Sequence, residues 1–171
     1  GGTNGNFSME VPGRSVNSLT DGSIGAISLV AGTSGNTSST NLVTCGNGGG
    51  AGSSLIYTLT NLSAGGFNLT NITVYGGWAD AGRDQQACTV YYSKLTAPTT
   101  FILLGSVNYN PADTANVPSA TRATLSSASG WLATSAAAVK FDFTKPASEN
   151  GYCGYAEIQL FGAPLSLVVA M

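Results

Sequence analysis

Hydrophobic and polar residues alternate along several short stretches of the chain, a pattern typical of β-strands with one buried face. The clearest case is 139–143, in which Val139, Phe141 and Phe143 share one face. No stretch repeats its hydrophobic residues every 3.6 positions, and the Ala-rich run 133–138 has room for one helical turn at most. The pattern therefore predicts an all-β fold. The other predicted strands are 26–31, 55–59, 72–75, 88–92, 101–107, 121–125 and 155–161.

About eight short strands with polar connections predict one antiparallel β-sandwich. No linker divides the 171 residues, so we expect a single domain. We expect 1–14 to be an extended segment, 15–163 to be the sandwich, and 164–171 to be an apolar terminal strand or tail. The core is expected to hold the apolar members of the alternating strands: Ile72, Val74, Val90, Phe141, Phe143, Ile158 and Leu160.

Charged residues make up only 8% of the sequence, with six basic and eight acidic side chains. Nucleic acid is not an expected partner, because neutralising phosphates needs concentrated Lys and Arg. No apolar run approaches the roughly 20 residues of a membrane span. The composition, rich in Gly, Ser, Thr and Asn, instead predicts solubility through hydroxyls and amides.

Two features favour a secreted or cell-surface location. Three cysteines (Cys45, Cys88 and Cys153) permit one disulfide, and their spacing matches no zinc or redox motif. The chain also contains five N-x-Ser/Thr glycosylation sequons, although a composition of this kind generates such triplets by chance. The sequons begin at Asn6, Asn36, Asn61, Asn68 and Asn71.

The segment 76–86 is the leading candidate for a ligand-binding loop. It joins two predicted strands and is far longer than a hairpin turn requires. It carries Trp78, Asp80, Arg83 and Asp84, which make it chemically rich for a spacer. The alternative is that Arg83 pairs with Asp80 or Asp84 and only holds the shape of the loop.

Catalysis is not expected from this composition. The chain has no histidine, and serine or cysteine nucleophiles usually need a neighbouring base. A glycosidase would need two carboxyl groups held across a cleft by rigid elements. Asp80 and Asp84 share one Gly-flanked loop, so we predict that the protein is not an enzyme.

Four short motifs stand out along the chain: LTDG (19–22), TVYYS (89–93), VKFDF (139–143) and GYAEIQLFG (154–162). Together they resemble the galactose-binding-like, discoidin or coagulation-factor C-type superfamily. The resemblance covers about 15–163 and implies an eight-stranded jelly-roll sandwich. Many members of that superfamily are carbohydrate-binding modules of secreted enzymes, and others bind phospholipid, collagen or cell-surface glycans.

The resemblance also implies a structural Ca²⁺ site. In many members, the Asp of an early D-G turn and the Glu of the last strand bind calcium together with carbonyls and a hydroxyl. These positions match Asp21 and Glu157, with Ala156 as a carbonyl donor, and hard oxygen ligands suit calcium. The expected hydroxyl position is Ala26 in this chain. Its possible substitutes are Ser23 and Ser28. The alternative is that Asp21 caps a turn and Glu157 pairs with a lysine.

The superfamily fold brings the regions of Cys88 and Cys153 toward one end of the sandwich. We therefore expect a Cys88–Cys153 disulfide that leaves Cys45, in a Gly-rich loop, free or in an intermolecular bond. Pairings through Cys45 remain open.

The predicted function is a non-catalytic extracellular glycan-binding module. Sugars are recognised by an aromatic face together with a few planar polar groups. Trp131 is a second aromatic candidate, unless it packs against the end of the sandwich. The expected ligand-binding residues are Trp78, Arg83, Asp84, Asn150, Tyr152 and Tyr155.

The alternative function is a structural subunit of an extracellular filament or surface assembly. The apolar run 165–171 is costly to leave in water and could pair with the sheet edge of a neighbour. Phe7, Met9 and Val11 alternate and offer a second edge. Such a protein would associate with copies of itself.

Overall fold

The computed structural model describes residues 2–4, 7, 16–24, 43–45, 52–59, 65–78, 82–112, 119–144, 146 and 151–165. Regular structure in this part of the chain is nearly all strand, which confirms the all-β prediction. The predicted strand at 26–31 lies outside the described residues. The elements are β1 (Gly2–Asn4), the 3-10 helix η1 (Val16–Thr20), β2 (Val43–Cys45), β3 (Ser53–Thr58), β4 (Phe67–Trp78), β5 (Gln86–Lys94), β6 (Ala97–Tyr109), β7 (Ser119–Ser126), β8 (Ala133–Phe143) and β9 (Cys153–Pro164).

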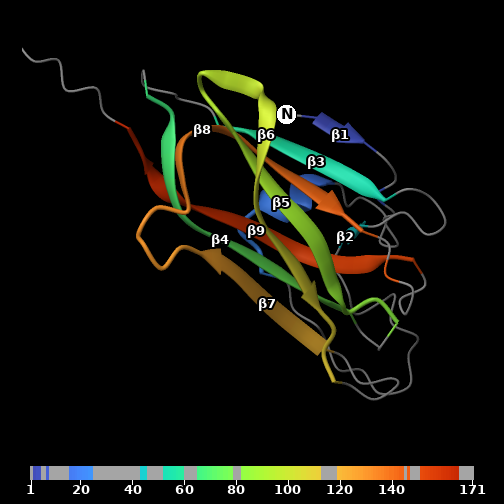
Figure 1. Ribbon diagram of the computed structural model, residues 1–171. Coiled ribbons are helices and arrows are strands. Elements are labelled where there is room, and N and C mark those ends of the chain that lie inside the picture. Colours follow the sequence, from blue (N-terminus) through green and yellow to red (C-terminus); the bar gives the residue numbers. More distant parts are fainter. Residues whose placement is uncertain are drawn as a thin grey trace, which may run out of the picture.

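Strand pairing arranges these strands in two layers (Figure 1). One layer has the order β1-β3-β8-β5-β6, and the other has the order β7-β4-β9-β2. All the pairs are antiparallel, and the layers join where the first residues of β4 pair with those of β8. Buried side chains from both layers form one core between them. The fold is therefore a β-sandwich, as predicted.

The two strands on either side of the candidate loop do not form a hairpin. β4 pairs with β7, β8 and β9, whereas β5 pairs with β6 and β8. The connection from Trp78 to Gln86 therefore crosses from one layer to the other at an end of the sandwich. Alternation alone could not predict this, because it identifies the buried face of a strand but not its neighbour.

The predicted core residues are buried, with Leu160 partly buried at the margin. Aromatic rings dominate its centre, where Phe143 stacks on Phe141 at 6.1 Å and contacts Tyr155 at 4.9 Å between centroids. Phe7 packs its ring edge-on against Phe143, so this N-terminal residue belongs to the same core. Met9 and Val11, the rest of the predicted N-terminal alternation, lie outside the described residues.

A bulge in β9 changes which side chains face the core. Tyr75 pairs with Glu157 and the next residue, Gly76, pairs with Tyr155, so Ala156 is an extra residue in the ladder. Tyr155 and Ile158 are consequently both buried in the core although they are three positions apart. Strict alternation would have placed Tyr155 on the opposite face from Ile158.

The Ala-rich run 133–138 forms the first half of β8 and not a helical turn. Ser135 has a φ of 53°, and its carbonyl accepts a hydrogen bond from the N–H of Leu95 at 2.9 Å. This irregularity lies where β8 leaves β4 and begins to pair with β3 and β5. The backbone of Ser135 also approaches Gly66 so closely that a Cβ there would lie 2.8 Å from it. Small residues at this corner therefore let the two layers meet.

The predicted Cys88–Cys153 disulfide is not present in this structure. Cys88 is a buried free thiol on β5, between Phe143 of β8 and Val107 of β6. Cys153 lies in the other layer, where β9 pairs with β2. The fold places the two residues in different layers, and both are buried in the core between them.

Candidate functional site

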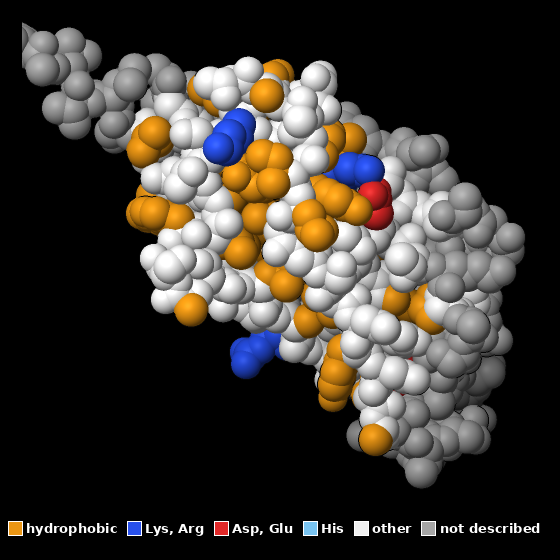
Figure 2. All heavy atoms as spheres, viewed as in Figure 1, with side chains coloured by type: hydrophobic (Ala, Val, Ile, Leu, Met, Phe, Trp, Pro, Cys, Tyr) orange, Lys and Arg blue, Asp and Glu red, His pale blue; other side chains and the backbone are white. Residues whose placement is uncertain are grey.

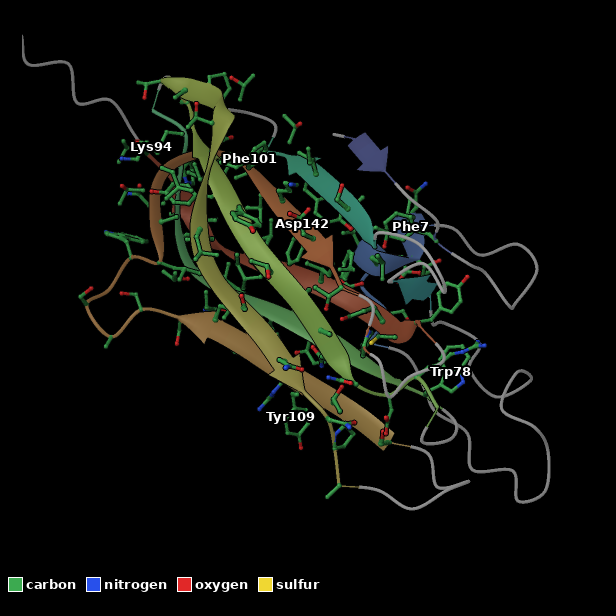
Figure 3. All side chains as sticks on the ribbon, turned by 45° about the vertical axis from the view of Figure 1, so that its right-hand side comes forward. Phe7, Trp78, Lys94, Phe101, Tyr109 and Asp142 are labelled. Atoms are coloured by element: carbon green, nitrogen blue, oxygen red, sulfur yellow. The ribbon has the colours of Figure 1, made fainter. Side chains whose placement is uncertain are left out.

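Several strands end together at one end of the sandwich. β4 ends there at Trp78, β5 begins at Gln86, β7 begins at Ser119, and β9 begins at Cys153. Figure 3 shows Trp78 at this end and Lys94 at the opposite end of the molecule. These four residues lie on paired strands, and Arg83, Asp84 and Tyr152 lie on the connections directly next to them.

The Arg83 guanidinium lies between two aromatic rings at this end. Its Cζ atom is 5.2 Å from the centroid of Trp78 and 5.6 Å from that of Tyr152, both within cation–π range. The carbonyl of Arg83 accepts a hydrogen bond from the N–H of Gly154 at 2.7 Å, which ties the loop to β9. Burial lowers the pKa of Arg83, and Tyr152 acts in the opposite direction. The guanidinium nevertheless stays charged at neutral pH.

Buried polar side chains next to this cluster are joined by hydrogen bonds. The hydroxyl of Ser119 donates to the Asp84 carboxylate at 2.6 Å, and the amide of Gln86 donates to the Thr121 hydroxyl at 2.8 Å. The Gln86 amide also donates to the carbonyl of Val74 at 3.3 Å. These bonds join the loop to β7 and β4. Sequence reasoning did not predict the parts played by Ser119, Gln86 and Thr121, because no local motif marks them.

The predicted ligand-binding residues differ in their exposure to solvent. Arg83 and Tyr152 are partly exposed, whereas Trp78 is 3% exposed and Asp84 is fully buried. Tyr155 is also fully buried, and its hydroxyl accepts a hydrogen bond from the N–H of Ala87 at 2.8 Å. The bulge at Ala156 turns Tyr155 into the core, so it cannot contact a ligand in this structure. The sixth residue, Asn150, lies outside the described residues, as does Asp80.

Trp131 lies at the other end of the sandwich. Its neighbour Leu132 donates a backbone hydrogen bond to Leu69, near the start of β4. Leu69 is separated from Trp78 by about 30 Å along the strand at the usual rise per residue. Trp131 is 48% exposed, so it does not pack tightly against the sandwich. It therefore cannot share a small ligand with Arg83.

Asp21 and Glu157, which lie far apart in the sequence, are close together in the structure. The N–H of Gly22 donates to the Glu157 carboxylate at 3.2 Å, and the N–H of Ser23 donates to the Asp21 carboxylate at 2.8 Å. Burial raises the pKa of Glu157 most, and the hydrogen bond from the Gly22 backbone opposes it. The charge of Asp21 raises the pKa further, whereas a hydrogen bond from the Asp21 backbone lowers it. Asp21 does cap a turn. The lysine partner considered for Glu157 is not found among the described residues, where Lys140 pairs with Asp142.

The donor set at this position fits a hard cation only in part. Two carboxylates converge, one of them nearly buried, and Ala156 precedes Glu157 in the bulge. Within the described ranges no group of three or more His, Cys, Asp or Glu residues gathers in one place. Backbone carbonyls or water would have to complete a calcium site. Ala26 and Ser28 lie outside the described residues.

The outer face of the β1-β3-β8-β5-β6 layer carries a second surface feature. Figure 2 shows hydrophobic side chains gathered over β5 and β6, near an ion pair. In that pair the Lys140 ammonium lies 2.8 Å from Asp142, 5.4 Å from the Tyr91 ring and 5.9 Å from the Phe101 ring. A hollow of about 410 Å³ between Ile56 and Phe101 is lined mainly by apolar side chains.

The glycosylation sequons are only partly described. Asn68 and Asn71 lie on β4 and are partly buried, and the side-chain oxygen of Asn68 accepts a hydrogen bond from the N–H of Ser135 at 3.1 Å. The remaining sequons, at Asn6, Asn36 and Asn61, lie outside the described residues. Glycosylation at all five positions stays a prediction.

Comparison with known proteins supports the fold. No protein-family model and no curated protein matches the chain. Among solved structures, a CBM32 module of a GH31 protein, bound to GalNAc, aligns with a TM-score of 0.53 and 11% identity, covering 94% of this chain and 95% of that one. Another CBM32 module, from a family 31 glycoside hydrolase of Clostridium perfringens, aligns with a TM-score of 0.51 and 13% identity, covering 94% and 92%.

These neighbours are carbohydrate-binding modules, and the likeness supports the predicted β-sandwich fold. Identities this low establish the architecture and not a shared ligand. In the described part of the chain, no helix has the length and apolar character needed to span a bilayer.

Proposed function

We propose that the chain is a non-catalytic glycan-binding module of a secreted or cell-surface protein. The observation that supports this most is the position of Arg83 between Trp78 and Tyr152, at an end of the sandwich where rigid strands converge. The guanidinium offers planar donors for sugar hydroxyls, and the partly exposed Tyr152 offers a ring for the C–H face of a sugar. Trp78 is too buried for this and instead fixes Arg83.

The same geometry disfavours catalysis at this site. Asp84 is fully buried and accepts a hydrogen bond from Ser119, an arrangement that suits a structural role better than proton transfer to a ligand. A binding module needs only pre-positioned donors and an aromatic surface, and both are present. Because one structural neighbour was solved with GalNAc, galactose-type sugars are the first ligands to test.

A glycan array tests the proposal. The wild-type protein is expected to bind a defined set of glycans, and Arg83→Ala is expected to weaken that binding by about 10- to 100-fold, the range for a lost hydrogen bond to a charged group. Arg83→Lys keeps the charge but not the planar donors, so it should recover only part of the affinity. An array with no bound glycan would reject the function.

A structural Ca²⁺ ion bound by Asp21 and Glu157 is a further part of this proposal. It is supported by the convergence of two carboxylates that lie far apart in sequence, one of them nearly buried. A bound ion would neutralise both charges and hold the turn after η1 against β9. Millimolar Ca²⁺ should then raise the melting temperature relative to chelator, and Asp21→Asn should remove that rise. An identical melting temperature in both solutions would count against the site.

Self-association is the second candidate function, and the exposed edge strand β6 favours it. β6 pairs only with β5 among the described strands, contains no charged residue, and exposes Ile102 by 41% and Leu103 by 60%. Native proteins usually protect such edges with charges. The N–H of Leu165 donates to Gly66, so the chain leaves the sandwich beside β4, and the apolar run beyond it lies outside the described residues.

Light scattering distinguishes this role from a monomeric module. If β6 mediates assembly, Leu103→Lys should reduce the particle size, whereas Asn108→Lys, at an exposed position near the end of the same strand, should reduce it less. A monomer at high concentration, with no change on either substitution or on removal of 165–171, would exclude assembly.

A further inference from the structure

The register between β2 and β9 places two cysteines directly opposite each other. Val43, Thr44 and Cys45 are paired in turn with Tyr155, Gly154 and Cys153. Directly opposed residues of an antiparallel pair have Cα atoms about 4.5 to 5.5 Å apart and side chains on the same face. Disulfides need Cα separations of about 4.4 to 6.8 Å. The backbone of this pair of strands therefore meets the requirement for a cross-strand disulfide.

The alternation along β2 is also consistent with this pairing. Val43 and Cys153 are both fully buried in the core, and residue 45 lies two positions from Val43, which is one full period of a strand. Cys88 has no comparable partner. It lies opposite Phe143 and Val107, and burial raises the pKa of its thiol to about 12, so it stays protonated and unreactive.

We propose that Cys45 and Cys153 form a disulfide when the chain folds in an oxidising environment, and that Cys88 remains a thiol. Two thiols give up two protons and two electrons, and a small-molecule disulfide such as oxidised glutathione accepts them. One cysteine attacks that disulfide and releases one glutathione thiol. The other cysteine then displaces the second glutathione from the mixed disulfide.

The bond would anchor a short edge strand. β2 has only three residues and lies at the edge of its layer, beside β9. Gly154, between Cys153 and Tyr155, donates its N–H to the carbonyl of Arg83. The cross-link would hold β2 against this part of β9, and through it the loop that carries Arg83. A consequence that rests on the proposed glycan function is weaker glycan binding after reduction.

Trypsin separates the three cysteines, which makes the test direct. Cleavage after Lys and Arg, except before Pro146, places Cys45 in 15–83, Cys88 in 84–94 and Cys153 in 141–171. The intact chain is refolded with oxidised and reduced glutathione, alkylated without reduction, and mapped by mass spectrometry. The expected result is a peptide pair 15–83 with 141–171, lighter by two hydrogens than the separate thiol peptides, and an unlinked 84–94. A link to 84–94, or alkylation of both Cys45 and Cys153, would overturn the proposal.

Thermal unfolding provides a second readout. Because the bond closes a loop of more than 100 residues, reduction should lower the melting temperature of the wild type by roughly 10 °C. Cys88→Ala should show the same drop, and Cys45→Ser should show none. An equal drop in Cys45→Ser would contradict the proposal. If the linked peptides form but no glycan binds, the proposed function fails and the disulfide stands.

Discussion

The Glu157 carboxylate occupies a position where a negative charge is costly. It is 4% exposed, lies beside Asp21, and receives backbone hydrogen bonds from Gly22 and Asp21. Its pKa is raised in the folded state, so the fold binds this proton more tightly than the unfolded chain does. Stability from this group is therefore greatest while the carboxyl is protonated, and it is lost as pH rises through the raised pKa.

Glu157→Gln tests this electrostatic cost. The amide keeps an oxygen that can accept the Gly22 hydrogen bond but carries no charge. In chelator we expect the variant to have a higher free energy of unfolding than wild type at pH 7, and a similar one near pH 3, where both chains are uncharged at this position. Asp142→Asn, which removes a carboxylate paired with Lys140, serves as the control and should not gain stability at pH 7. Denaturant titrations at both pH values measure the effect, and a destabilised Glu157→Gln at pH 7 would contradict it.

Single residues also show where sequence reasoning reached its limit. The resemblance to galactose-binding-like domains placed Asp21 and Glu157 together, and the structure does so. Tyr152 and Tyr155 were equivalent candidates in the sequence, yet one is partly exposed and the other is completely buried. The difference arises from the bulge at Ala156, which is a property of the pairing between two strands. The sequence of a single strand therefore does not reveal the bulge.

At the scale of elements, alternation predicted the seven strands β3 to β9 because each has one face in the core. It failed where pairing changes along a strand. The Ala-rich start of β8 has no alternating hydrophobic pattern, and it is a strand because β4 and then β5 and β3 pair with it. Pairing with strands distant in the sequence also determines that β4 and β5 lie in different layers.

Gly66 lies at the corner where these pairings change, and its substitution tests that corner. Gly66 has a φ of 79°, and a Cβ added there would lie 2.8 Å from the backbone of Ser135. Gly130 has a φ of 113° with open space around it, so it is a matched control. Gly130→Ala should cost about 1 kcal/mol of unfolding free energy from backbone strain. Gly66→Ala should cost about 3 kcal/mol, since a steric clash is added. Equal costs in denaturant titrations would mean that the corner is not tightly packed.

At the scale of the whole molecule, the sandwich separates two exposed aromatic regions. One end holds Arg83 and Tyr152, and the opposite end holds Trp131. Both Tyr152 and Trp131 present ring surface to solvent, but only Tyr152 has a charged donor beside it and a buried polar layer beneath that donor. The proposed function therefore predicts that glycan binding depends on the Tyr152 end and not on the Trp131 end.

Isothermal titration of the best glycan into two variants measures that asymmetry. Tyr152→Ala should weaken binding by about tenfold or more, through loss of the stacking surface and of the ring that positions Arg83. Trp131→Ala should leave the affinity unchanged, because that ring lies at the far end of the sandwich. Thermal unfolding confirms that both variants are folded before the titration. Unchanged affinity in Tyr152→Ala, or a loss of binding confined to Trp131→Ala, would contradict the assignment of the glycan site to the Arg83 end.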